Sequence, residues 1–267
     1  MKTRTLNTFR QIVYAKSGIA LSDKKEALVC ARVGKRVRAL GLGSYEQYLD
    51  VLQNDESGAE MVELLDAVCT NVTSFFRDAE QFDFLVTQMR SWIAAGQTRF
   101  RFWSAASSTG EEPYSLAIAL LEAAEGRALD MRILATDLST TALEQCRAGV
   151  YEERKIQTVP PPLLSRYFSV ERFDGVRHYR VKPELTRMVV IRRMNLSQPP
   201  FPMRGPLDAI LCRNVMIYFD NPVRQRLLAD IHRLLKDGGY LFVGHAESLT
   251  GIVSPMKYVR PAIYTRS

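Results

Sequence analysis

The sequence predicts an α/β fold: a mostly parallel β-sheet covered by helices, with a helical part before it and a small antiparallel β-insert within it. Two observations lead to this prediction. From Arg99 onward, apolar runs of strand length alternate with longer runs of helix length. Residues 1 to about 70 contain only helix-like patterns. Such alternation is typical of parallel strands joined by helical crossovers.

Residues 1–77 are expected to form an all-helical domain that carries a basic helix. Ser22 or Asp23 can cap a helix that ends near Gly41. One face of this helix carries the apolar residues Val29, Val33, Val37 and Leu40. The opposite face carries six cations: Lys24, Lys25, Arg32, Lys35, Arg36 and Arg38. This basic face is either solvated surface or a docking surface for an acidic partner.

Residues 78–267 are expected to form the sheet domain. Asp78 can cap a helix that begins at Ala79, and the helix before the last parallel strand spans PVRQRLLADIHRLLKDGG. The predicted parallel strands lie in FRFWSA, MRILATD, MVVIRRMNL, LDAILCRN and YLFVGHAE, and KYVRPAIYTR can close the sheet with antiparallel strands. Residues 150–183 break the alternation, and the pattern around Asp174-Gly175 predicts an inserted β-hairpin subdomain.

Composition narrows the class of protein. An apolar fraction of 46% and a charged fraction of 24% are ordinary for a globular chain. We find no apolar run near 18 residues and no signal peptide, so we expect a cytoplasmic protein with no membrane insertion. The cysteines and histidines lack metal-ligand spacing, so we expect no metal and only structural histidines.

Ligands of a parallel sheet bind at the carboxyl ends of its strands. The first strand leads into WSAASSTGEEPYSLAIAL, where Gly110 precedes Glu111 and Glu112. Phosphate loops avoid acids, and neither GxGxxG nor GxxxxGK[ST] is present there. Asp137 after the second strand can accept hydrogen bonds from a ribose, or it can cap a helix. An adenosyl ligand with positive charge and no phosphate fits these acids, and S-adenosylmethionine is such a ligand.

Five ordered motifs carry a family resemblance. NVTSFFRD, WSAASSTGEEPYSLAI, ATDLSTTALEQCRAGVY, DAILCRNVMIYFD and LLKDGGYLFVGHAESL closely resemble the CheR family of chemotaxis receptor methyltransferases. The resemblance covers nearly the whole chain. It implies a Rossmann-like class I S-adenosylmethionine-dependent methyltransferase sheet with a helical N-terminal domain. It also implies methyl transfer to glutamate side chains of chemoreceptors, giving methyl esters and S-adenosylhomocysteine.

The same resemblance implies site residues. The cofactor contacts would be Asn71, Thr73, Arg77, Glu112, Asp137, Asn195, Leu196, Arg213 and Asn214, with Glu111 left open beside Glu112. Tyr218 matches a tyrosine near the transferred methyl group, and Arg77 can hold a carboxylate of the cofactor or of the acceptor. We therefore expect Arg77 and Tyr218 to be the catalytic residues.

The resemblance also implies a partner. The six cations of the basic helix would face the cytoplasmic helical bundle of a chemoreceptor, and the enzyme would be recruited to receptor arrays in a bacterial cytoplasm. In this family the inserted hairpin can dock a receptor's C-terminal pentapeptide, and members that do so tend to carry GxG there. FSVERFDGVRHYRV has one glycine and no GxG. We therefore expect methylation independent of that peptide.

Two alternatives differ in class. A non-catalytic S-adenosylmethionine-binding signalling scaffold would bind the cofactor and receptor without turnover, although Arg77 and Tyr218 argue against it. A nucleic-acid methyltransferase would explain the basic N-terminus and QPPFP at residues 198–202. Base methylation typically uses Asn or Asp before Pro-Pro-aromatic at the end of the fourth strand. Here the residue is Gln198 and the segment precedes that strand, so we expect no nucleic-acid partner.

Overall fold

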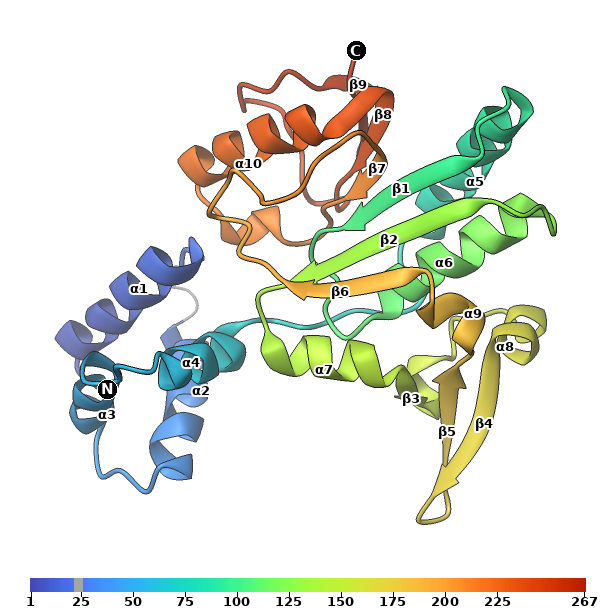
Figure 1. Ribbon diagram of the computed structural model, residues 1–267. Helices are drawn as coiled ribbons and strands as arrows, with labels where there is room; N and C mark the ends of the chain where they lie inside the picture. The colour runs from blue at the N-terminus through green and yellow to red at the C-terminus, as the bar shows by residue number, and fades with distance from the viewer. Residues whose placement is uncertain (22–25) are drawn as a thin grey trace.

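The computed structural model describes residues 1–21 and 26–267, and its centre is a seven-stranded sheet in the order β6-β2-β1-β7-β8-β10-β9 (Figure 1). The strands are β1 (Arg99–Ser104), β2 (Asp130–Asp137), β6 (Val189–Arg193), β7 (Leu207–Leu211), β8 (Leu235–Phe242), β9 (Lys257–Arg260) and β10 (Ile263–Thr265). β6, β2, β1, β7 and β8 pair in parallel, and β10 pairs antiparallel to both β8 and β9. The predicted α/β sheet is confirmed, including its antiparallel edge.

Helices cover both faces of this sheet because its strands are apolar on both sides. α5 (Ala79–Ala94) and α6 (Glu111–Ala124) pack on one face, against side chains such as Phe100 and Phe102 of β1. α10 (Asn221–Leu234) packs on the other face, against Trp103 and Ile210. α7 (Thr140–Ala148) lies beside β2 and β6. Because these strands are parallel, their carboxyl ends lie at one common edge of the sheet.

α10 ends earlier than the sequence pattern predicts. The helix stops at Leu234, and the segment from Leu235 through Gly239 belongs to β8. The Arg266 guanidinium donates to the carbonyls of His232 at 2.9 Å and Leu235 at 2.6 Å. A side chain from the end of the chain thus satisfies the last helical carbonyls, which sequence periodicity does not reveal.

The inserted subdomain is a three-stranded antiparallel sheet in the order β3-β5-β4. Its elements are β3 (Val150–Glu152), the 3₁₀ turn η2 (Glu153–Lys155), α8 (Pro161–Tyr167), β4 (Phe168–Phe173) and β5 (Val176–Val181), and the short α9 (Pro183–Thr186) leads back to β6. Asp174 and Gly175 form the β4–β5 turn with φ of 49° and 78°, as a two-residue type I′ hairpin requires. The hairpin points away from the main sheet (Figure 1).

The N-terminal part contains, among its described residues, the helices α1 (Thr3–Ser17), α2 (Glu26–Ala39), α3 (Tyr45–Gln53) and α4 (Ala59–Val68). Val29, Val33 and Val37 of α2 are buried in its core, as predicted. Leu40 does not belong to this face: it lies beyond the helix end and is 41% exposed. The predicted caps Ser22 and Asp23 lie outside the described residues.

Among the polar contacts that join the helical part to the sheet domain, two groups lie at different helices. At one, Asp66 of α4 accepts hydrogen bonds from the backbone and hydroxyl groups of Thr140 and Thr141, at the first turn of α7. At the other, the Tyr14 hydroxyl donates to Asp220 at 2.5 Å and the Ala20 N–H donates to the Tyr218 carbonyl at 2.8 Å. The helical part therefore lies over the carboxyl edge of the sheet.

No helix in the described ranges is both long and apolar enough to cross a membrane.

Candidate active site

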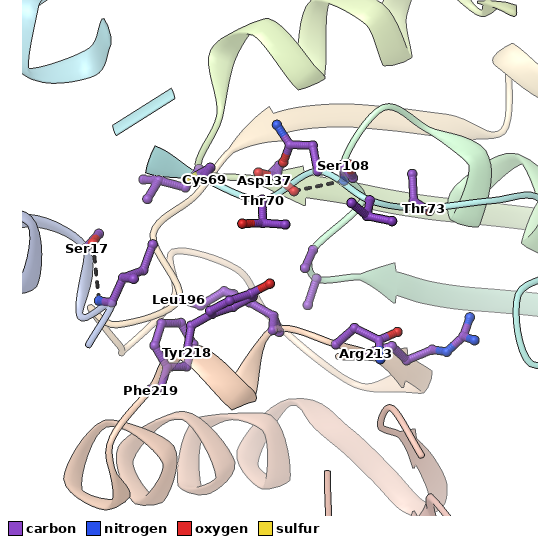
Figure 2. A pocket seen from close by; sticks show the side chains of 18 of the residues that line it. Ser17, Cys69, Thr70, Thr73, Ser108, Asp137, Leu196, Arg213, Tyr218 and Phe219 are labelled. Atoms are coloured by element: carbon purple, nitrogen blue, oxygen red, sulfur yellow. Dashed lines mark hydrogen bonds between the residues drawn. The ribbon is translucent and has the colours of Figure 1, made fainter. Parts of the chain in front are cut away.

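A cavity opens where the strand order reverses between β1 and β7, the position at which doubly wound sheets bind ligands (Figure 2). It encloses about 1070 Å³, part of which is open to solvent. Loops that follow β1, β2, β6 and β7 form one wall. The linker of residues 68–77 and the end of α1 form the other.

All nine residues predicted to contact the cofactor line this one cavity, and so does Tyr218. They come from segments that lie far apart in the sequence: Asn71, Thr73, Arg77, Glu112, Asp137, Asn195, Leu196, Arg213 and Asn214. Their individual roles toward a ligand stay predictions. The geometry shows that they share one cavity.

Glu112 and Arg213 form a buried ion pair at the base of the cavity. The Glu112 carboxylate accepts from the Ser104 hydroxyl at 2.7 Å and from Arg213 Nη1 at 3.1 Å. Burial raises the pKa of Glu112, while the Arg213 charge opposes that rise. Arg213 Nη2 also donates to Asp78 at 2.7 Å and to the Arg77 carbonyl. One guanidinium thus connects the first turn of α6 with the linker.

Asp78 does not cap α5 as predicted. It occupies the N-cap position, but its backbone is left-handed, with φ of 57°, and its side chain makes no capping bond. Its carboxylate turns instead to Arg213, because a charged bond to a buried guanidinium is stronger than a bond to a backbone N–H.

Glu111, which the sequence left open, does not line the cavity. Its side chain is fully buried, pairs with Lys155 at 2.8 Å and accepts from the Thr109 hydroxyl at 2.6 Å. Lys155 belongs to the inserted subdomain, so Glu111 joins that subdomain to the loop after β1. Of the two glutamates, Glu112 is the one that faces the cavity.

Asp137 is held by backbone groups on both sides. Its Oδ2 accepts from Ser108 N–H at 2.8 Å, and its Oδ1 accepts from Ser139 N–H at 3.0 Å. The N-cap of α7 is Ser139, whose hydroxyl accepts from Ala142 N–H. The helix-cap role considered for Asp137 therefore belongs to Ser139. Burial raises the pKa of the Asp137 carboxyl.

Asn195 uses most of its side chain within the protein. Its Oδ1 accepts from both the N–H and the hydroxyl of Ser197, and its Nδ2 donates to the Lys16 carbonyl at 2.8 Å. One amide hydrogen is left for a ligand. The adjacent Leu196 is a buried apolar wall.

Tyr218 and Phe219 lie across the cavity from Asp137 (Figure 2). Tyr218 ends the short 3₁₀ turn η3 (Met216–Tyr218) after β7. Arg77 is half-buried, and its Nη1 donates to the Val72 carbonyl at 3.2 Å. Arg77 and Tyr218 line the same cavity as Glu112 and Asp137.

The structure adds wall residues that sequence reasoning missed. Ser17, Ile19, Leu21 and Leu28 come from the helical domain, and no local pattern marks them as lining a site 100 residues away. Ser108 lies within the loop after β1 that the sequence analysis discusses, so its position at a strand end could have marked it as a candidate. Ser108 lines the cavity, and its buried hydroxyl has no hydrogen-bond partner in the described part of the chain. It is a donor that suits a polar adenosyl ligand.

The six cations of the basic helix do not behave alike. Arg32 donates to the carbonyls of Val68 and Cys69. Arg36 pairs with Glu60 at 2.6 Å and Glu63 at 2.9 Å. Both are used to join α2 to α4, which the helical wheel could not show. Lys35 and Arg38 are exposed, whereas Lys24 and Lys25 lie outside the described residues.

Asp78, Glu80 and His245 have side-chain oxygen and nitrogen atoms within 4.8 Å of one another. The His245 ring hydrogen-bonds to Glu80, and Asp78 pairs with Arg213, which accounts for the cluster without an ion. The expectation of no metal stays a prediction.

The chain is similar to known proteins over most of its length. Residues 71–264 match the family model described as CheR methyltransferase, SAM binding domain, and residues 4–69 match the model described as CheR methyltransferase, all-alpha domain. The chain is 38% identical to a chemotaxis protein methyltransferase of Salmonella typhimurium, covering 96% of this chain and 88% of that protein. It is 38% identical to one of Escherichia coli, covering 90% and 82%, and 34% identical to one of Borreliella burgdorferi, covering 98% and 94%.

Proposed function

The chain belongs to the CheR methyltransferase family, and on that premise we propose that it transfers a methyl group from S-adenosylmethionine to glutamate carboxylates of chemoreceptors. The products are glutamate methyl esters and S-adenosylhomocysteine. The observation that carries the proposal is the gathering of Glu112, Asp137, Asn214 and Tyr218 in one cavity at the carboxyl edge of the sheet.

The cavity suits a cationic adenosyl ligand. Asp137 has two oxygens held at fixed positions by backbone N–H groups, which leaves lone pairs for ribose hydroxyls. Glu112 and Asp137 supply negative charge, and the Ser108 hydroxyl supplies an unused donor. Leu196 and Phe219 supply apolar surface for a flat base.

The chemistry needs no general base. The acceptor carboxylate has a reference pKa of about 4.3 and is ionised at pH 7. When bound, S-adenosylmethionine supplies a methyl group on a positively charged sulfur. A bond forms between carboxylate oxygen and methyl carbon, the carbon–sulfur bond breaks, and its electron pair stays on sulfur. The protein's task is to align the three atoms and exclude water. We assign the holding of a carboxylate to Arg77 and a hydrogen bond near the reacting groups to Tyr218.

The acceptor is proposed to be the cytoplasmic helical bundle of a chemoreceptor, and the enzyme to be cytoplasmic and recruited to receptor arrays. Lys35 and Arg38 support this, because they are exposed cations on the domain that covers the cavity. Arg32 and Arg36 have a different role: they hold α2 against α4. We propose neither a nucleic-acid partner nor insertion into a membrane.

We further propose that methylation does not require a receptor C-terminal pentapeptide. The β4–β5 turn has Gly175 as its single glycine, without the GxG that peptide-dependent members tend to carry. Receptor fragments with and without the terminal five residues should be methylated with kcat/KM values within about twofold of each other. A loss of tenfold or more on truncation would contradict this part of the proposal.

The central experiment is calorimetric titration with S-adenosylmethionine and S-adenosylhomocysteine, followed by methyl transfer from labelled cofactor to receptor fragments. Wild type should bind both ligands, and Asp137→Ala should lose most of that affinity. Base-labile label should appear on receptor glutamates and not on RNA or DNA. Binding without transfer would indicate a signalling scaffold, and label on nucleic acid would indicate the other alternative. No binding by folded wild type would contradict the methyltransferase proposal.

A further inference from the structure

The loop after β7 carries Arg213, Asn214 and Tyr218, and its backbone is held by a carboxylate from the loop after β8. That carboxylate belongs to Glu247, which is 6% exposed. Its Oε2 accepts from the N–H groups of Asn214 at 2.6 Å and Gly244 at 2.7 Å. Its Oε1 accepts from Ile217 N–H at 3.1 Å. One side chain therefore joins two loops at the ends of adjacent parallel strands.

The backbone that Glu247 holds has a left-handed conformation at Asn214, where φ is 58°. Asparagine adopts this region more readily than most residues other than glycine, and the contact with Glu247 fixes the conformation at this position. The bond from Asn214 N–H to Glu247 is a charge-assisted contact at this residue.

The loop after β8 packs closely against the same contact between Asn214 and Glu247. The Glu247 N–H donates back to the Gly244 carbonyl at 2.8 Å, which closes a tight turn. A Cβ at Gly244 would lie 2.4 Å from Asn214 Nδ2 and 2.8 Å from Glu247 Oε2. The absence of a side chain at position 244 thus allows Asn214 and Glu247 to meet.

Glu247 makes no ion pair within residues 1–21 and 26–267. Its three acceptor contacts are all to backbone N–H groups, a pattern that stabilises a buried anion without a cation. Burying a carboxylate is costly, and an apolar side chain would stabilise the core at lower cost. A role in setting loop geometry explains why a carboxylate is present.

We propose that Glu247 is a positioning residue for methyl transfer. By holding the backbone of Asn214 and Ile217, it orients the side chains of Arg213, Asn214 and Tyr218 toward the cavity. The inference rests on the proposed function, because Glu247 would position these three side chains relative to the adenosyl ligand and the acceptor.

The test compares four variants at a temperature where each is folded. Glu247→Ala removes the acceptor, Glu247→Gln keeps one oxygen of it, and Gly244→Ala displaces it without altering Glu247. Asp208→Asn is the control. Asp208 is also buried and accepts a backbone N–H, from Arg101 at 2.6 Å, but it also pairs with Lys236 at 2.6 Å and lies at the opposite end of β7. All four are measured for thermal stability, S-adenosylhomocysteine affinity and kcat on a receptor fragment.

We expect Glu247→Ala and Gly244→Ala to weaken S-adenosylhomocysteine binding about tenfold and to lower kcat about 100-fold. Glu247→Gln should fall between wild type and Glu247→Ala. Asp208→Asn should lose stability while keeping affinity and kcat within about twofold of wild type. If one variant does not fold, the other two at the same contact still decide the question.

If folded Glu247→Ala and Gly244→Ala keep S-adenosylhomocysteine affinity and kcat within twofold of wild type, this inference is overturned. The proposed function would then be unaffected. An equal loss of kcat in Asp208→Asn would also overturn it, because the effect would then be general destabilisation. A wild-type protein that does not bind S-adenosylhomocysteine would overturn the proposed function, and the inference with it.

Discussion

The guanidinium of Arg213 lies between two carboxylates, 3.1 Å from Glu112 and 2.7 Å from Asp78. The Arg213 side chain is 2% exposed, and its Cζ lies 5.5 Å from the centre of the Phe82 ring. The arrangement connects the start of α6 to the start of α5 beneath the cavity. Without the arginine, Glu112 would be a buried, uncompensated charge, and the partly exposed Asp78 would lose its guanidinium partner.

Arg213→Met should therefore lower the free energy of unfolding by about 3–5 kcal/mol, because it leaves the buried Glu112 carboxylate unpaired. Urea denaturation measures this change. The control is Arg101→Met, which breaks a pair with the half-exposed Asp130 and should cost about 1 kcal/mol or less. Equal losses in the two variants would show that the Arg213 pair contributes no more than a surface pair.

Asp137 should make cofactor affinity depend on pH. Burial raises its pKa above the usual 3.8, so protonation occurs at a higher pH than for an exposed Asp. Ribose binding favours the ionised form, so S-adenosylhomocysteine affinity should fall as the pH decreases through this raised value. For the ligand-free protein the sign is opposite, since neutralising a buried carboxyl stabilises the fold.

Calorimetric titrations across the acid range check this expectation, with Asp137→Asn as the reference. The variant should bind weakly at every pH and show a flatter pH profile. A wild-type profile as flat as that of the variant would exclude Asp137 as the titrating group.

Tyr218→Phe should separate chemistry from binding. If the hydroxyl acts near the reacting groups, its loss should lower kcat about 100-fold. The phenyl ring keeps its place beside Phe219, so S-adenosylhomocysteine affinity should stay within about twofold. Single-turnover methylation and calorimetry measure the two quantities. A parallel loss of both would instead indicate a role in shaping the cavity.

Lys35 and Arg38 should act on receptor binding alone. Reversing both charges in Lys35→Glu/Arg38→Glu should raise the KM for a receptor fragment about tenfold at low salt, with little change at high salt. The affinity for S-adenosylhomocysteine should not change. The control is Lys257→Glu/Arg90→Glu, which reverses two other exposed cations. An equal effect in the control would mean that only net charge matters.

Asp66 should hold the two domains together in a pH-dependent way. Burial opposes its ionisation, but hydrogen bonds from Thr140 and Thr141 outweigh burial and lower its pKa below 3.8. Its stabilising contribution is therefore complete above pH 3.8 and is lost as the pH falls through the lowered value.

Asp66→Ala should cost about 1–2 kcal/mol at pH 7, the scale of losing a helix N-cap. Urea denaturation of wild type and variant over a pH series measures the difference. That difference should shrink below pH 3.8. A difference independent of pH would show that packing, not the carboxylate, accounts for the loss.

The sequence by itself determined the succession of strands and helices along the chain and many of the residues at the strand ends that line the cavity. Those features are local: a strand shows its apolar run, and Asp137 and Asn214 stand where a strand ends. Parallel strands end at one edge, so residues at successive strand ends must gather. The five motifs identified the family for the same reason, because each motif is contiguous in the chain.

Only the tertiary structure decided which groups pair across that edge. Asp66 and Thr140 lie 74 positions apart, and Asp78 and Arg213 lie 135 apart. A local pattern reports which side of a helix is apolar, and it does not report which distant acid lies opposite an arginine. Three features depend on such pairings between distant segments: the ion pair of Arg36 with Glu60, the part of the cavity wall that α1 forms, and the hydrogen bond from Asn214 to Glu247. These pairings form only when the chain is folded.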